Sequence, residues 1–337
     1  MITAVTGANG HVGANLVRAL VAGGRPTRSL VHINRRSISG LGTEIIICDV
    51  REQESLCRAF DGVDVVYHLA ANISITMKEW PLLEWINVIG TRNVVEACLR
   101  SGVRRLVHFS SIHALVQEPL GTPVDEARPL VASRHSPPYD RSKALADKEV
   151  LSGIEKGLDA VIINPTAIIG PNDYQLSYIG EALLAMANGK LPAMVAGGYD
   201  WVDVRDIVEG AMRAEEQAKS GERYILSGHW VSIRDIAAMV SEITGVSTPG
   251  FVCPLWLARL GAPILHSFSN LREKWPLYTS VSMRALKSNH SISHEKAAND
   301  LGYQPRPFRE TMIDTLRWYG DNGHLNDSAV VKAVESR

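Results

Sequence analysis

The stretch Thr6-Gly7-Ala8-Asn9-Gly10-His11-Val12-Gly13 decides the fold of this chain. Its glycines are spaced G-x-x-G-x-x-G, after an apolar run that predicts a strand and before a run that predicts a helix. We expect Gly7 to make a tight turn, Gly10 to let backbone approach a phosphate, and Gly13 to let the helix pack closely on the sheet. Free N–H groups at the start of the helix would face the phosphate. A purely structural turn is the alternative, but the flanking strand and helix favour a dinucleotide-binding loop.

The first half of the chain alternates short apolar runs with longer helical patterns. Strands are predicted at Ile2–Val5, Thr27–His32, Thr43–Ile47, Val63–His68, Leu106–Ser110 and Ala160–Ile163. Helices are predicted at Val12–Ala22, Arg51–Phe60, Leu82–Arg100 and Tyr139–Leu151. Uninterrupted apolar strands indicate burial on both faces, and their alternation with helices indicates a parallel sheet with right-handed crossovers. The predicted fold class is therefore α/β, a doubly wound Rossmann sheet with a smaller, interleaved C-terminal substrate domain.

The strand rhythm becomes sparse after Pro165, where Gly, Pro and aromatic residues are frequent. Tyr224–Leu226 predicts one more strand of the main sheet, and Ser232 with Asp235 predicts a capped helix start. No Ser/Gly-rich linker separates two domains. We therefore predict a dinucleotide-binding domain of residues 1–165 plus about 200–230, a substrate domain of residues 166–199 and 231–325, and a flexible tail of residues 326–337.

Composition excludes several classes of protein. With 45% apolar residues, 21% charged residues and a net charge of -1, the chain is neither disordered nor a general partner of nucleic acid or anionic membrane. No signal peptide and no stretch that could span a membrane is visible. The four cysteines are scattered and lack metal-site spacing. We expect a cytoplasmic protein with free thiols and no metal.

The end of the second predicted strand, about 20 residues beyond the glycine loop, meets the adenosine ribose in this fold. An acidic residue there favours NAD, but the sequence has His32, then Arg35 and Arg36, and no Asp or Glu. Because a guanidinium binds phosphate through two hydrogen bonds, the arginines favour NADP(H) over NAD(H). A solvated loop is the alternative reading of both. Asp49, after the third strand, is placed to accept from the adenine amino group.

Tyr139 and Lys143 lie four residues apart on a predicted helix, so they share one face. A free Tyr titrates at about pH 10, and we expect the Lys143 ammonium to lower the pKa of Tyr139. Ser110 and Ser111 end a strand at the carboxyl edge of the sheet, where a hydroxyl can bind a substrate oxygen. These residues predict proton transfer by Tyr139, with Lys143 also able to hold the nicotinamide ribose.

With these motifs the chain resembles the extended short-chain dehydrogenase/reductase family, from its N-terminus to about Leu325. The matching segments are the glycine loop, Asp49-Val50, residues 68–71, residues 87–94, residues 109–111, Tyr139 with Ser142-Lys143, and residues 164–171. The resemblance implies a catalytic triad of Ser111, Tyr139 and Lys143, with Ser111 preferred over Ser110 because it aligns with the second serine of the family's T-S-S pattern. It further implies cofactor contacts from Gly7, Asn9, Gly10, His11, Val12, Gly13, Val50, Leu69, Ala70, Ala71, Asn87, Ser110, Asn164, Pro165, Ala167 and Ile168.

Within that family the chain is most similar to the dihydroflavonol-4-reductase and 3β-hydroxysteroid dehydrogenase branch. The resemblance implies hydride transfer at a secondary alcohol or ketone on a fairly apolar molecule, and a homodimer through helices 82–100 and 139–151. Two positions depart from the pattern. His32 stands where the reductases often have arginine, which leaves the choice of cofactor open. Asn164-Pro165 stands where Arg-Pro is usual.

Aromatic residues gather in the second half and predict an apolar pocket with few polar groups. The substrate candidates are Tyr174, Tyr178, Trp201 and, beside the serine pair, His113. The apolar stretch Phe251–Leu271 can form a lid, a dimer surface or a membrane-peripheral patch, of which we favour a lid or pocket wall.

Three functions remain after this reading. The leading one is an NAD(P)-dependent alcohol dehydrogenase or ketone reductase, whose partner is a small molecule. The second is a sugar-nucleotide epimerase or dehydratase with tightly held NAD, which needs basic residues in the second half. The third is a non-catalytic dinucleotide sensor, which the presence of both Tyr139 and Lys143 disfavours.

Overall fold

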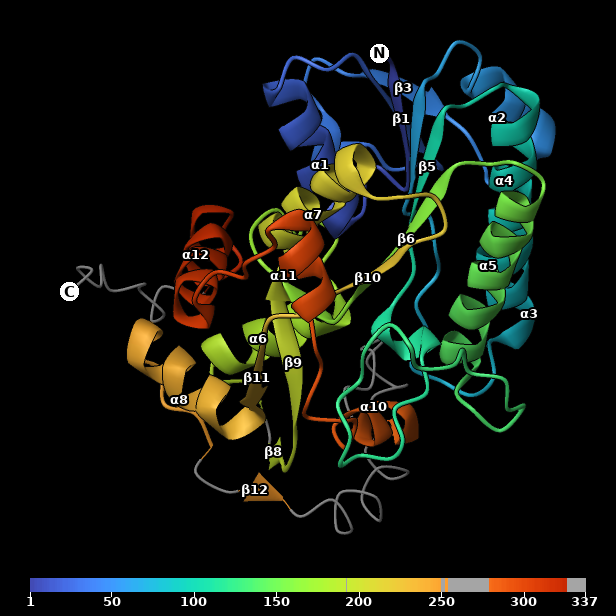
Figure 1. Cartoon of the computed structure of the whole chain (residues 1–337). Coiled ribbons are helices and arrows are strands. Elements are labelled where there is room, and N and C mark those ends of the chain that lie inside the picture. The colour runs from blue at the N-terminus through green and yellow to red at the C-terminus, as the bar shows by residue number, and fades with distance from the viewer. Residues whose placement is uncertain (192, 250–251, 254–278, 326–337) are drawn as a thin grey trace.

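The computed structural model describes residues 1–191, 193–249, 252–253 and 279–325. At its centre is a seven-stranded parallel sheet with the order β10-β6-β5-β4-β1-β2-β3 (Figure 1). These strands are β1 (Thr3–Thr6), β2 (Thr27–Val31), β3 (Glu44–Ile47), β4 (Val65–His68), β5 (Arg105–Phe109), β6 (Ala160–Pro165) and β10 (Arg223–Leu226). Every residue of β1, β4, β5 and β6 is buried, as expected for a sheet covered on both faces. The predicted doubly wound α/β fold is confirmed.

Helices cover the two faces of this sheet in two groups (Figure 1). One group is α1 (His11–Ala22), α7 (Val204–Gln217) and α11 (Glu295–Leu301); the other is α2 (Gln53–Ala59), α4 (Gly90–Arg100) and α5 (Pro138–Glu155). Successive strand residues feed two separate cores, because side chains alternate across a strand. Val107 packs toward α1 and α7, and Leu106 packs toward α2 and α4.

The helix predicted at Leu82–Arg100 is not uniform. It consists of α3 (Trp80–Leu83), a π-helical stretch (Glu84–Ile89) and α4. The polar side chain of Asn87 is buried within the π-helical stretch. A regular hydrophobic period cannot predict such a local change of helix winding.

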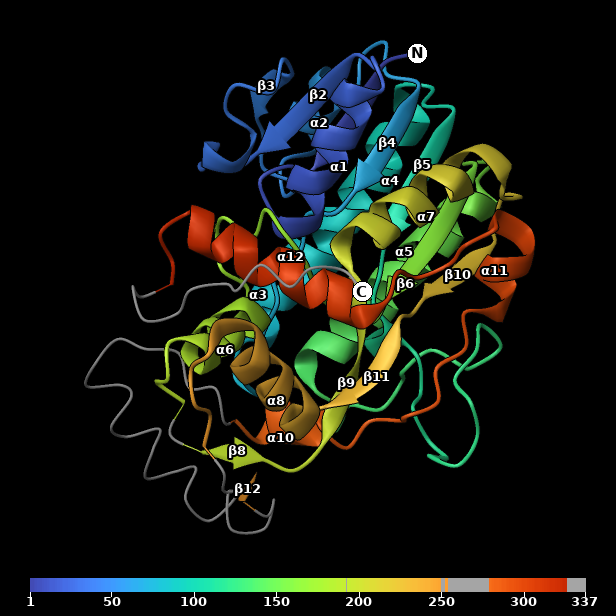
Figure 2. The same ribbon diagram turned by 90° about the vertical axis from the view of Figure 1, so that its left-hand side faces the viewer.

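A second region lies beyond the carboxyl ends of the parallel strands (Figure 2). It contains a three-stranded sheet, β11-β9-β7, and a two-stranded sheet, β12-β8. Its elements are β7 (Ala167–Ile169), α6 (Tyr178–Ala187), β8 (Met194–Val195), β9 (Gly198–Asp203), β11 (His229–Ser232), α8 (Ile233–Thr244), β12 (Val252–Cys253), α10 (Ser280–Ala285) and α12 (Phe308–Asp321). Ser232 caps α8 as expected, its hydroxyl accepting from the Asp235 N–H at 3.1 Å. Sequence reasoning missed these strands because they are short and interrupted by polar residues.

The chain passes several times between the two regions. Only Thr166 separates β6 of the main sheet from β7, and α7 and β10 return to the main sheet after β9. α11, which falls in the range assigned to the substrate domain, packs on α7 and β10. Residues 251 and 254–271 of the apolar stretch and the tail 326–337 lie outside the described residues. In the part of the chain that is described, no helix is long and apolar enough to cross a membrane.

Candidate active site

The glycine loop joins β1 to α1 where the strand order reverses, between β1 and β4. Gly7 has φ +67°, which favours glycine, and a Cβ there would lie 2.7 Å from the Ala70 nitrogen. A Cβ on Gly13 would lie 2.2 Å from the Gly7 carbonyl oxygen, so α1 packs as closely as the spacing predicts. Gly10 precedes α1, whose first turn has neither a side-chain cap nor an acidic residue. The N–H groups of this turn are therefore suited to bind a phosphate.

One cavity of about 1000 Å³ extends from this loop into the second region. The predicted site residues that line it are Gly10, His11, Val12, Leu69, Ala71, Ser110, Ser111, His113, Tyr139, Lys143, Pro165, Ala167, Ile168, Tyr178 and Trp201. The predicted residues outside its lining are Gly7, Asn9, Gly13, His32, Arg35, Arg36, Asp49, Val50, Ala70, Asn87, Asn164 and Tyr174. The cavity therefore brings the glycine loop, the Ser-Tyr-Lys residues and the apolar second region together.

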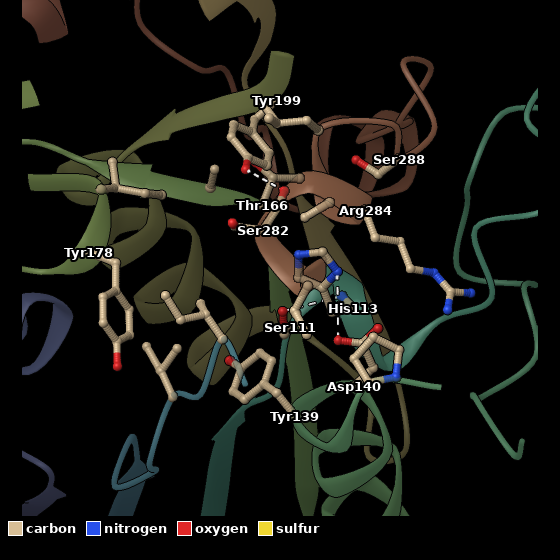
Figure 3. A pocket seen from close by; sticks show the side chains of 18 of the residues that line it. Ser111, His113, Tyr139, Asp140, Thr166, Tyr178, Tyr199, Ser282, Arg284 and Ser288 are labelled. Carbon is tan, nitrogen blue, oxygen red and sulfur yellow. Dashed lines mark hydrogen bonds and ion pairs between the residues drawn. The ribbon is translucent and has the colours of Figure 1, made fainter. Parts of the chain in front are cut away.

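Tyr139 and Lys143 lie one turn apart near the start of α5, which begins at Pro138. Ser111 follows β5, and its hydroxyl is the neighbouring polar group that acts to lower the pKa of Tyr139. Figure 3 shows the two side chains close together in the lining of the cavity. Lys143 is buried, and its Nζ donates to the Phe109 carbonyl oxygen at 2.8 Å. The three residues expected to form the triad are thus adjacent.

The pKa values of this group differ from the expectation. Burial raises the pKa of Tyr139, which the Ser111 hydroxyl opposes, and Lys143 is not among the groups that act on it. The lowering expected from Lys143 is absent because Lys143 has already lost its charge at the higher pH where Tyr139 ionises. Burial lowers the pKa of Lys143 to about 8. Lys143 therefore changes charge close to neutral pH.

Two buried polar atoms beside the triad have no hydrogen-bond partner among the described residues. These are the Ser110 hydroxyl and Oδ1 of Asn164. The other end of the Asn164 amide donates to the Ser111 carbonyl oxygen at 2.7 Å. Asn164 thus fixes the turn that carries Ser111. Unpaired buried polar atoms are costly, so both are suited to a bound polar ligand such as a nicotinamide nucleotide.

The adenosine end has a different arrangement from the one expected. Asp49, expected to accept from adenine, is held by the Arg51 side chain, and His32 Nε2 lies 3.3 Å from its carboxylate. These contacts lower the pKa of Asp49, with the Arg51 hydrogen bonds as the largest cause. Arg35 and Arg36 are exposed, and no ion pair joins either to a described residue. Both guanidinium groups are accessible to a phosphate.

The side-chain amide of Asn87 is hydrogen-bonded to other residues of the chain. Its Nδ2 donates to Asn72 and to the Ser142 hydroxyl at 2.9 Å each, and its Oδ1 accepts from the Asn72 N–H at 2.7 Å. These bonds tie the segment after β4 to α5. They favour a structural role over a direct cofactor contact.

The substrate candidates separate into two groups. His113, Tyr178 and Trp201 line the cavity, and His113 Nδ1 lies 4.0 Å from the Asp140 carboxylate (Figure 3). Tyr174 is directed away from the cavity, accepts from Arg18 at 3.0 Å and packs edge-on against Trp318. Sequence reasoning missed several polar lining residues, which have no motif of their own: Asp140, Thr166, Tyr199, Ser282 and Arg284.

Tyr139 lines the same cavity as the glycine loop and as a set of apolar side chains that we call the apolar chamber: Leu183, Met186, Met194, Val195, Trp201 and Ile236. A dinucleotide at the loop and a substrate in the chamber would meet there. Fold and site together define a dinucleotide-dependent enzyme with a Ser-Tyr-Lys centre.

Comparison with known proteins gives the family. Residues 3–227 match the model of the NAD dependent epimerase/dehydratase family. The chain is 35% identical to sterol demethylase protein B of Methylococcus capsulatus, covering 96% of this chain and 100% of that one. It is 31% identical to a putative dihydroflavonol 4-reductase of Synechocystis, covering 95% of each. The solved structure of a protein named gox2253 is 34% identical, with a TM-score of 0.84 over 96% of this chain and 99% of that one. The chain belongs to the NAD-dependent epimerase/dehydratase family of extended short-chain dehydrogenases/reductases, and it is an oxidoreductase.

Proposed function

We propose that the protein transfers hydride between a nicotinamide cofactor and a secondary alcohol or ketone, or an aldehyde, of a fairly apolar small molecule. The observation that carries this proposal is the grouping of Ser111, Tyr139 and Lys143 in the lining of one cavity with the glycine loop and an apolar chamber. The names of the relatives, a dihydroflavonol 4-reductase and a 3beta-hydroxysteroid dehydrogenase among them, support the same chemistry.

Ser111, Tyr139 and Lys143 would each have a separate role in such a reaction. A bound nicotinamide supplies or accepts the hydride. Tyr139 donates its proton to a carbonyl oxygen in reduction, or removes a proton from an alcohol in oxidation. Ser111 binds the same oxygen and keeps it beside Tyr139. Lys143, charged below a pH of about 8, holds positive charge near the phenol as the proton leaves.

The size and lining of the chamber support a bulky substrate. Apolar side chains from α6, β8, β9 and α8 enclose it: Leu183, Met186, Met194, Val195, Trp201 and Ile236. Burial of such a surface favours an apolar ligand, and a few polar groups fix its orientation. His113 and Tyr178 are the candidates for that orientation.

We propose NADP(H) as the preferred cofactor, because Arg35 and Arg36 are exposed beyond β2 and no acidic residue ends that strand. The epimerase alternative receives less support from the cavity. Of the second-half arginines, Arg205 is paired with Asp203 and Asp314, and Arg284 lines the cavity. A diphosphate would find few free cations among the described lining residues.

The test is a fluorescence titration of the purified protein with NADPH and NADH, followed by a panel of bulky ketones and aldehydes. Tight NADPH binding and oxidation by a bulky ketone are expected. Tyr139→Phe should keep cofactor binding and lose turnover. NAD that co-purifies with the protein, with no turnover of any carbonyl, would favour the epimerase; full function of Tyr139→Phe would favour the sensor.

We also propose a homodimer through residues 82–100 and 139–151. α4 and α5 pack side by side, and large apolar side chains are exposed on this face: Leu82, Trp85 and Leu151. Exposed apolar groups of this kind are suited to a partner surface. Light scattering should give twice the mass of the chain, and Leu151→Glu should give the monomer. A monomeric wild type would contradict this proposal.

A further inference from the structure

Directly behind Lys143, on the same face of α5, lies a buried carboxylate that the proposed reaction does not use. Asp147 is one turn beyond Lys143 and two turns beyond Tyr139, and its side chain is fully buried. Its oxygens lie 3.0 Å from Arg223 Nη2 on β10 and 3.4 Å from His108 Nε2 on β5. Tyr139, Lys143 and Asp147 therefore form a line from the cavity into the protein.

Stability alone does not account for this cluster. Burying a carboxylate and a guanidinium costs free energy that their attraction repays only with good geometry and further hydrogen bonds. Here neither Asp147 oxygen, nor Nη1 of Arg223, has a hydrogen bond of good geometry within the described part of the chain. Apolar side chains would fill the same space at least as well. The charge of Asp147 thus calls for another explanation.

We propose that Asp147 is a positioning residue that keeps Lys143 protonated beside Tyr139, and that Arg223 sets the strength of its effect. The proposal rests on the proposed function, since it assigns Lys143 a role in proton transfer. It concerns the charge of one lysine, however, which can be measured without turnover.

The surroundings of Lys143 leave Asp147 as the group that opposes loss of its proton. Burial lowers the pKa of Lys143, and Asp147 is the charged group that raises it. His68 on β4 and His108 on β5 also face this region. Burial lowers the pKa of each, which favours their neutral forms. The Phe109 carbonyl contributes only a dipole.

The proposal predicts that Asp147→Asn and Arg223→Met change the pKa of Lys143 in opposite directions. Asp147→Asn removes the negative charge, so the pKa of Lys143 should fall by about one from its value of about 8. Arg223→Met removes the positive charge next to Asp147, so the pKa of Lys143 should rise. Asp147→Glu restores the charge and should return the pKa toward the wild-type value. Asp140→Asn is the matched control: it lies on the same helix but does not act on Lys143, and it should leave this pKa unchanged.

The experiment is a pH titration of the full chain labelled with 13C at the lysine ε-carbons, followed by NMR. The Lys143 signal is assigned by its loss in Lys143→Arg. Opposite shifts in Asp147→Asn and Arg223→Met support the proposal. Shifts in the same direction, or no shift in either, overturn it, because a purely structural role gives no sign reversal. If circular dichroism shows that Asp147→Asn does not fold, Arg223→Met decides alone: a raised pKa supports the proposal, and an unchanged or lowered one overturns it.

The result is separable from the proposed function. Opposite shifts together with no turnover of any carbonyl would sustain the effect of Asp147 on Lys143 and refute the reductase. Turnover by the wild type, with a Lys143 pKa that is unchanged in the variants, would support the reductase and refute the effect of Asp147. If both the reductase function and the effect of Asp147 on Lys143 are correct, the alkaline limb of the plot of kcat/KM against pH should move. It should move to lower pH in Asp147→Asn and to higher pH in Arg223→Met.

Discussion

Replacing Gly13 with alanine tests whether stability and dinucleotide binding depend on the close packing of α1 against the glycine loop. The new Cβ would lie 2.2 Å from the Gly7 carbonyl oxygen and 2.9 Å from the Ala8 Cα. Ordinary contact requires about 3.5 Å, so helix or loop must move by about 1 Å. Such overpacking costs about 1–3 kcal/mol, against a gain of about 1 kcal/mol from the better helix propensity of alanine. We expect Gly13→Ala to destabilise the fold by up to about 2 kcal/mol.

The same displacement should weaken dinucleotide binding, because the N–H groups of α1 move with it. We expect the Kd for NADPH to rise at least about tenfold, or 1.4 kcal/mol. Urea unfolding and a fluorescence titration measure the two effects. Gly121→Ala is the control, since a Cβ there meets nothing within 4 Å. A Gly13→Ala protein that is more stable than the wild type and binds NADPH equally well would refute the reasoning.

Three further predictions concern the cofactor, the charge of Lys143 and the chamber. Arg35→Ala and Arg36→Ala should weaken NADPH binding by about 10- to 100-fold and leave NADH binding unchanged, as separate titrations would show; equal losses for both cofactors would make the arginines nonspecific. Burial lowers the pKa of Lys143 from 10.5 to about 8, so the charged form of Lys143 destabilises the fold. Lys143→Met should therefore have a higher Tm than the wild type at pH 7. The difference in Tm should shrink as the pH rises from 8 to 10.5, because Lys143 of the folded wild type loses its charge over this range. A margin that grows with pH would reverse the sign of this argument. Ala182→Trp, which fills the chamber wall, should raise KM for a bulky ketone and spare NADPH binding; a loss of NADPH binding would show that the chamber and the glycine loop are not separate.

Local features of the sequence were sufficient for the fold and for the centre of the site. The glycine loop dictates its own turn through Gly7 and its own helix packing through Gly13. The four-residue spacing of Tyr139 and Lys143 places them together once a helix forms. Such features depend on neighbours in the chain, which is why a sequence without its structure predicts them.

Features that depend on distant residues were not predictable. Asn87 is held by Asn72 and by Ser142, and no motif indicates which partner such a polar side chain will find. The Asp147 cluster joins three elements that are far apart in the chain. Tyr174 resembled a pocket residue by composition, but its direction follows from contacts with Arg18 and Trp318.

The return of the chain to the main sheet has a consequence for its synthesis. The core around α1 contains Val5 and Leu16 from the beginning of the chain, and Ile207 and Ala211 from α7. During synthesis, the face of the sheet that α1 and α7 cover lacks α7 until residue 217 has left the ribosome. The sheet lacks its edge strand β10 until residue 226 has left it. A fragment that ends at residue 165 therefore leaves apolar surface open to chaperones and to aggregation. The dinucleotide-binding half cannot mature before the chain has passed through the substrate-binding half and come back.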